Sequence, residues 1–178
     1  ILKAADKKSV IRLSSHSKEE ILFSYEICPD AILIPGIKSP EEIDLVLRNY
    51  MLPPLGERGY SPYTFPSVNN KNKTKLYLQI ENKEALTFID KFFENKFIDG
   101  IFFGRYDLAI SLGLEPNSSE ILDVIIKATE KFKKYSKPIG TVSFLEDDQI
   151  LLRNKFDFLT IGSDTSMLLE QSKYLKLI

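Results

Sequence analysis

The sequence has little of several features that would point to a particular class of protein. Cys28 is its only cysteine, which excludes an internal disulfide and a thiolate metal cluster. The formal net charge is −1 and the basic residues are scattered among acidic ones, so no basic stripe favours nucleic acid as a partner. No apolar run approaches about 20 residues and no signal-peptide pattern opens the chain, so we expect no membrane partner and a cytoplasmic location.

What the chain does contain is a regular alternation of short apolar runs and amphipathic stretches over 178 residues, a length that suits one sizeable core. Runs rich in Ile, Val, Leu or Phe predict six buried parallel strands, at residues 9–14, 31–36, 75–81, 99–104, 138–144 and 156–162. Successive strand–helix units predict an α/β fold with right-handed crossovers. Since a complete eight-unit barrel needs about 200 residues or more, the six units suit either an open doubly wound sheet or three quarters of a barrel.

The starts of the predicted helices carry capping residues. Ser17-Lys-Glu-Glu20 and Ser39-Pro-Glu-Glu42 both match a capping box, the second with proline at the first helical position. Asn82 and either Ser118 or Ser119 suit the caps of later helices. The one irregular stretch is 52–74, which is rich in proline and asparagine, and a loop of this length at the strand ends is usually functional or mobile.

Two carboxylates, Glu81 and Asp107, come just after consecutive predicted strands. Side chains alternate along a strand, so Gln79 and Glu81 share one face and point inward while their apolar neighbours pack on helices. Carboxylates at the carboxyl ends of neighbouring strands favour a site for a hard divalent cation. Gly104 would let a ligand approach the backbone ahead of Asp107. The alternatives are that Glu81 is the first exposed residue after its strand and that Asp107 is a helix N-cap.

Two further side chains are candidates for chemistry. Arg12 lies in an apolar strand and alternation turns it inward with the acids, where a buried arginine needs an anionic partner, either a structural carboxylate or a substrate. His16 is the only histidine and follows Arg12 in a serine-rich turn. It is a candidate general base near neutral pH, with a surface residue as the alternative.

Seven short motifs occur in a fixed order over nearly the whole chain. They are Val10-Ile-Arg12, Ala31-Ile-Leu-Ile-Pro35, Pro53-Pro-Leu-Gly-Glu-Arg-Gly59, Gln79-Ile-Glu-Asn-Lys-Glu-Ala85, Asp99-Gly-Ile-Phe-Phe-Gly-Arg-Tyr-Asp-Leu108, Ser111-Leu-Gly113 and Ile161-Gly-Ser-Asp-Thr165. As a set they resemble the HpcH/HpaI aldolase family, metal-dependent class II aldolases of 2-keto-3-deoxy acids that are related to the citrate lyase β chain. The resemblance implies a (β/α)8 barrel of the TIM type. This chain, as a single domain over 1–178, would supply roughly its last six units, with the N-terminal units missing.

The resemblance also implies roles for individual residues. Glu81 and Asp107 would bind Mg²⁺ or Mn²⁺, which acts as a Lewis acid, and Arg12 would contact a pyruvate-like substrate. Backbone amides around Gly104, Tyr106 and Asp107 would hold the substrate carboxylate, with Gln79 supporting the site. The reaction would be reversible carbon–carbon cleavage that gives pyruvate, or a related 2-keto acid, and an aldehyde. Family members assemble as hexamers or trimers, so 166–178 is expected at an interface of a homo-oligomer.

Two departures from the family pattern leave alternatives open. The histidine-bearing segment that the family uses in proton transfer has no counterpart before Val10, and the loop after the Pro53–Gly59 motif is short. One alternative is a citrate lyase β-like enzyme acting on an acyl-CoA thioester. The other is a catalytically inactive fragment or binding module that keeps the fold.

Overall fold

A computed structural model describes residues 2–59, 74–143 and 152–175 of the chain. Its strands are β1 (Val10–Arg12), β2 (Ala31–Ile34), β3 (Lys75–Ile80), β4 (Gly100–Phe103), β5 (Ile139–Ser143) and β6 (Phe158–Ile161). Its helices are α1 (Lys18–Glu26), α2 (Pro40–Tyr50), α3 (Lys83–Thr87), α4 (Ile89–Glu94), α5 (Arg105–Leu112), α6 (Ser119–Phe132) and α8 (Asp164–Leu175), with 3-10 turns at Lys3–Ala5 and Lys133–Tyr135. All six predicted strands are therefore confirmed, each trimmed by one or two residues at one or both ends.

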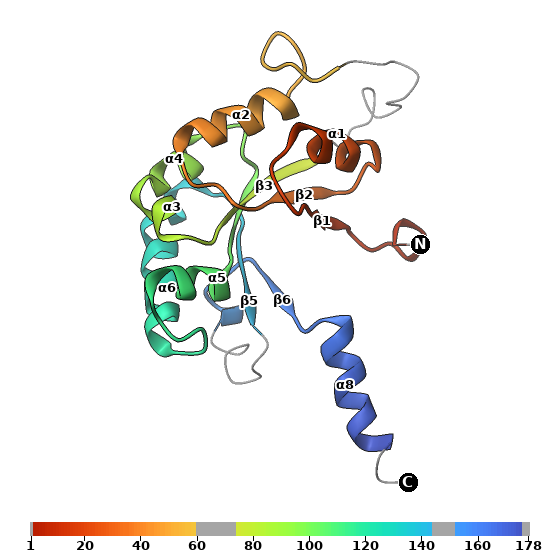
Figure 1. The fold of residues 1–178 in the computed structure, drawn as a ribbon, viewed down its shortest axis with the longest axis vertical. Coiled ribbons are helices and arrows are strands. Elements are labelled where there is room, and N and C mark those ends of the chain that lie inside the picture. Colours follow the sequence, from red (N-terminus) through yellow and green to blue (C-terminus); the bar gives the residue numbers. More distant parts are fainter. Residues whose placement is uncertain (1, 60–73, 144–151, 176–178) are drawn as a thin grey trace.

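The strands form one parallel sheet in the order β1-β2-β3-β4-β5-β6, so every strand lies beside its neighbour in the sequence. A doubly wound sheet would reverse its order part-way, and the described strands show no reversal. Figure 1 shows the sheet curling, with α2, α3, α4 and α6 along its outer side. The architecture is an α/β half-barrel, which favours the barrel alternative. None of the described helices is long and apolar enough to cross a membrane.

The two faces of the sheet are packed differently. On the convex face, strand residues such as Ile32, Leu78 and Phe103 are fully buried against the helices in the main core. On the concave face lies a second, smaller cluster, which we call the inner cluster: Leu33, Phe102 and Val142, with Tyr77, Tyr106 and Phe158 packed against it. The rings of Tyr77 and Phe158 meet with centroids 5.6 Å apart although their strands, β3 and β6, are separated by two others. The alternation of faces predicted for β3 is confirmed, because Leu76, Leu78 and Ile80 all face the main core.

The predicted helix starts are confirmed in most respects. Ser17, Ser39 and Asn82 are N-caps whose side chains accept a backbone N–H three residues later. The reciprocal half of each capping box is displaced, since Glu20 accepts from the backbone of Ser14 and Ser15 rather than from Ser17. Ser118 is the N-cap of α6 without a side-chain capping bond.

Aspartates just ahead of the even-numbered strands fasten the preceding strand. Asp30, ahead of β2, accepts from Ser9 N at 2.8 Å, next to the start of β1. Asp99 accepts from Leu76 N at 2.9 Å on β3, and Asp157 accepts from Ile139 N at 2.8 Å on β5. The bonds join β1 to β2, β3 to β4 and β5 to β6 at the amino ends of the strands.

Helix α8 extends away from the sheet (Figure 1). Its residues Met167, Leu168 and Leu169 are exposed, and Ile161 on the outer side of β6 is exposed as well. Among the described side chains, this apolar group of α8 is therefore not covered by the sheet or by its other helices.

Candidate functional site

Three of the predicted site residues contact one another at the carboxyl ends of the strands. Arg12 Nε donates to Gln79 Oε1 at 3.0 Å, and Gln79 Nε2 donates to Glu81 Oε2 at 2.6 Å. Arg12 Nη2 lies 3.6 Å from the same Glu81 oxygen. These contacts join β1 to β3 across β2, where Leu33 is the register partner of Arg12. The predicted convergence of Arg12, Gln79 and Glu81 is thus present.

The burial of these side chains differs from the prediction in one case. Gln79 is buried and the Glu81 side chain is 12% exposed, as a pair turned inward should be. The expectation of a buried arginine is wrong, because the Arg12 side chain is 50% exposed. The physical reason is position: β1 is the first strand in the sheet order, so within the described residues no strand covers its other side.

Backbone groups hold Glu81 from two directions. Its Oε1 accepts the N–H of Gly36 at 2.7 Å, and Gly36 has φ +77°, a left-handed conformation that favours glycine. On the other side, a Cβ on Gly104 would lie 2.9 Å from Glu81 Cβ and 2.5 Å from Gln79 Nε2. Glycine at 104 therefore lets the end of β4 pack directly on Gln79 and Glu81, whereas the approach of a ligand to this backbone stays a prediction.

Asp107 is an exposed residue in the first turn of α5. The alternative that it is an N-cap is wrong: the N-cap is Gly104, and no side chain caps α5. Its carboxylate has no hydrogen bond or ion pair within the described residues, and the positive end of the helix dipole favours a negative charge there. Asp107 thus remains available to a ligand above the end of β4.

His16 lies close to the loop that holds Glu81. Its Nδ1 is 3.7 Å from the position that a Cβ would take on Gly36, and the side chain is half-buried. The surface alternative is therefore only partly right. Gly36 therefore connects the two side chains, because it lies against the His16 imidazole and donates its N–H to the Glu81 carboxylate.

Comparisons with known proteins show which family the chain belongs to. A family model described as HpcH/HpaI aldolase/citrate lyase matches residues 1–170. The chain belongs to this family. Among its relatives are a 4-hydroxy-2-oxovalerate aldolase of Rhodococcus jostii, 27% identical over 96% of this chain and 70% of its own, and a 2-keto-3-deoxy-L-rhamnonate aldolase of Salmonella gallinarum, 29% identical over 90% and 65%. The chain thus spans about two thirds of the length of the curated relatives that it matches.

Solved structures of HpcH/HpaI proteins have the same fold. One from Burkholderia cenocepacia superposes with a TM-score of 0.86 at 18% identity, covering 99% of this chain and 76% of that one. The family and the names of the relatives identify the chain as a lyase of the aldolase type, and the resemblance seen in the sequence motifs is confirmed.

The residues present fit the divalent metal that the HpcH/HpaI resemblance implies. Glu81 is held in place by Gly36 and Gln79, and Asp107 offers an uncommitted carboxylate on the adjoining strand end. No group of three or more His, Cys, Asp or Glu side chains that could hold an ion occurs in the described residues. Two carboxylates, completed by water and substrate, suit Mg²⁺ or Mn²⁺ better than a metal that needs a full protein cage.

The sequence did not reveal that the concave face beside these polar residues would be aromatic. Phe102 is the register neighbour of Gln79, and Tyr106 packs against the inner cluster while its hydroxyl donates to Asn117 Oδ1 at 3.3 Å. A signal was available in Gly100 and Gly140, where a Cβ would collide with the rings of Tyr77 and Phe158. Glycine inside a strand often marks a place where another group approaches the backbone closely, and here that group is an aromatic ring from a neighbouring strand.

Arg105 was missed as well. It is fully buried at the start of α5, and its Nε donates to Pro116 O at 2.8 Å, which fastens the connection between α5 and α6. A charged residue directly after a buried strand gives no sign in the sequence that it will be enclosed.

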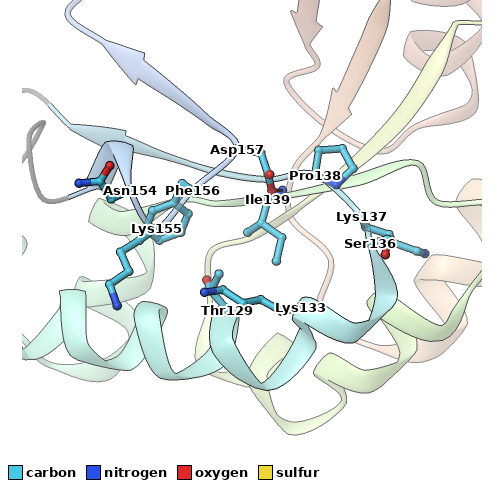
Figure 2. A pocket seen from close by; sticks show the side chains of 10 residues that line it. All are labelled: Thr129, Lys133, Ser136, Lys137, Pro138, Ile139, Asn154, Lys155, Phe156 and Asp157. Atoms are coloured by element: carbon cyan, nitrogen blue, oxygen red, sulfur yellow. Dashed lines mark hydrogen bonds between the residues drawn. The ribbon is translucent and has the colours of Figure 1, made fainter.

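A pocket of about 530 Å³ lies at the opposite end of the strands, beside the amino ends of β5 and β6 (Figure 2). Two of its three lysines are already engaged: Lys155 Nζ lies 3.1 Å from Glu130 Oε1, and Lys137 donates to the carbonyls of Phe92 and Asn95 at the end of α4. Burial lowers the pKa of Lys137. None of the predicted site residues lines this pocket, so it is separate from the candidate active site.

Proposed function

We propose that the protein is a divalent-metal-dependent aldolase of 4-hydroxy-2-keto acids. It would cleave or form the bond between carbons 3 and 4 of the substrate and release pyruvate, or a related 2-keto acid, and an aldehyde. The observation that carries the proposal is the contact of Arg12, Gln79 and Glu81 across β2 beside Gly104, which is followed by the first turn of α5 with Asp107. The aldolase names of the relatives support the same reaction class.

Arg12 is suited to bind the anionic part of the substrate. Its Nε is committed to Gln79, yet half of the side chain is exposed and the guanidinium has further N–H groups to donate. Donors fixed before the substrate arrives stabilise negative charge that develops on the substrate oxygen during cleavage. Gln79 keeps the guanidinium in place and ties it to Glu81.

The start of α5 is suited to bind the substrate carboxylate. The backbone N–H groups of its first turn, around Tyr106 and Asp107, point along the positive end of an eight-residue helix. Asp107 and Glu81 would hold Mg²⁺ or Mn²⁺, which when bound polarises the keto oxygen of the substrate as a Lewis acid. Orienting the substrate between Arg12 and α5 would place its carbon 3–carbon 4 bond over the concave face.

His16 is our candidate for proton transfer. Cleavage takes the proton from the hydroxyl on carbon 4, and carbon 3 must gain a proton to become the methyl group of pyruvate. A histidine beside Gly36 can serve as base and acid in turn. The contact of His16 with Gly36, whose N–H is bonded to Glu81, places the imidazole near the candidate site.

The proposal is tested by pyruvate release from a 4-hydroxy-2-keto acid, followed with lactate dehydrogenase and NADH. We expect turnover with Mg²⁺ or Mn²⁺, loss of turnover with a chelator, and a fall in kcat/KM of about 100-fold or more in Glu81→Gln. Glu84→Gln, the same change at an exposed residue nearby on α3, is the matched control and should keep full activity. Intact turnover in Glu81→Gln would sink the proposal.

Assays of the wild type and these variants also distinguish the two alternative functions. Turnover of an acyl-CoA thioester without turnover of the keto acid would favour the citrate lyase-like reaction, which the family description also covers. Binding of pyruvate or oxalate measured by calorimetry, with no turnover of either substrate class, would indicate a binding module.

We also propose that the protein is a homo-oligomer that uses α8. The support is the exposed apolar group Met167, Leu168 and Leu169 on a helix that stands away from the sheet. A surface of this kind commonly lies in a contact between proteins. Sedimentation of the protein and of Leu168→Glu would test it, since a monomeric wild type would contradict the proposal.

A further inference from the structure

Tyr106 is placed beside the candidate site by the packing of Gly104. Because the end of β4 lies directly against Gln79 and Glu81, α5 begins at the same edge of the sheet, and Tyr106 is the second residue of this helix. The Tyr106 ring packs inward against the inner cluster and remains only half-buried. Part of the ring is therefore covered by the inner cluster on the concave face, and part of it is exposed.

The apolar surface under this ring adjoins the polar site residues. Leu33 is the register neighbour of Arg12, and Phe102 is the register neighbour of Gln79, so both belong to the inner cluster and to the border of the site. The Tyr106 hydroxyl donates to Asn117 in the connection after α5, which fixes the direction of the ring. A ligand held by Arg12 and Glu81 would meet an aromatic surface on the β4–β5 side.

We infer that the Tyr106 ring is the wall against which the non-reacting carbon chain of the substrate packs, and that it limits the size of that chain. This inference rests on the proposed function and specifies its substrate class: 4-hydroxy-2-keto acids that are built from short, unbranched aldehydes. Specific pockets are typically apolar surfaces beside a few fixed polar groups. The hydroxyl is not required for this role, because it is directed to Asn117.

The test compares Tyr106→Ala and Tyr106→Phe with the wild type over a series of substrates with short and with branched aldehyde parts. Tyr106→Ala should raise the ratio of kcat/KM for branched over short substrates by about tenfold or more, because each methylene that a pocket accepts or rejects changes selectivity by about 10-fold to 200-fold. Tyr106→Phe should keep the wild-type ratio. Tyr135→Ala, which removes another half-buried tyrosine, is the control and should leave the ratio unchanged.

Calorimetric binding of 2-keto acids with increasing chain length gives a readout without turnover. We expect affinity to fall with chain length in the wild type and in Tyr106→Phe, and to become nearly independent of it in Tyr106→Ala. Turnover in the wild type with equal ratios in all variants would overturn the inference and leave the proposed function standing. Chain-length-dependent binding that is relieved in Tyr106→Ala, without turnover, would support the inference and refute the proposed reaction. Absence of both binding and turnover would overturn both.

Discussion

Replacing Gly104 by alanine should damage the stability of the protein and the candidate site together. The added methyl group would lie 2.5 Å from Gln79 Nε2 and 2.9 Å from Glu81 Cβ, and both distances are shorter than real contacts of a Cβ. The Gln79 amide could turn away, but the Glu81 Cβ is fixed to the backbone. Forcing a methyl group into a packed position costs about 1–3 kcal/mol. If the Gln79 amide is displaced, its 2.6 Å bond to the charged Glu81 carboxylate is lost as well, which is worth about 1.5–3 kcal/mol.

We therefore expect Gly104→Ala to lower the free energy of unfolding by about 2–3 kcal/mol. The two costs do not add in full, because turning the Gln79 amide away relieves part of the clash while it breaks the hydrogen bond. Urea unfolding followed by circular dichroism measures this difference. Gly59→Ala is the matched control, because a Cβ on Gly59 meets no atom within 4 Å, and it should change stability by no more than about 0.5 kcal/mol. Equal effects of the two substitutions would refute the packing of Gly104 on Gln79 and Glu81.

Two further substitutions test the supporting structure. Asn82→Ala removes the cap of α3 and a bond to Ile37 O and should cost about 1–2 kcal/mol in urea unfolding. Ser118→Ala should cost less because no side-chain bond caps α6 there, and the reverse order would contradict the capping role. Burial, with Asp99 and Asp157 nearby, raises the pKa of Tyr77. The neutral side chain therefore stabilises the folded state below the ordinary pKa of about 10, and this stabilisation is lost as the pH rises through the pKa in the folded state. Tyr77→Phe should therefore reduce the fall in stability above about pH 10. Part of the fall should remain in the variant, because burial also raises the pKa of Tyr50. An identical pH profile of stability in the variant and the wild type would contradict this.

The sequence was enough to predict the strands and the face of β3 that carries Gln79 and Glu81, because buried strands are short apolar runs and their side chains alternate. It also predicted the caps at Ser17, Ser39 and Asn82, since capping bonds join residues only three apart. These features depend on local chemistry alone.

Features that depend on the order of distant strands could not be predicted in the same way. The exposure of Arg12 follows from the position of β1 at the end of the sheet order, which no local pattern contains. The meeting of Tyr77 with Phe158 requires β3 and β6 to curl toward each other. Asp107 was open to two interpretations because the sequence did not show that α5 begins immediately after Gly104.

The aspartates at the amino ends of the strands and the candidate site at the carboxyl ends connect different strands of the sheet. Asp30 and Asp99 each tie two strands into a unit, β1 with β2 and β3 with β4. The bonds from Arg12 to Gln79 and from Gly36 to Glu81 both run from the first unit to the second, at the carboxyl ends. The residues that we expect to bind substrate therefore also join the first two of the three strand pairs, and a ligand that spans them would add a further connection between these pairs.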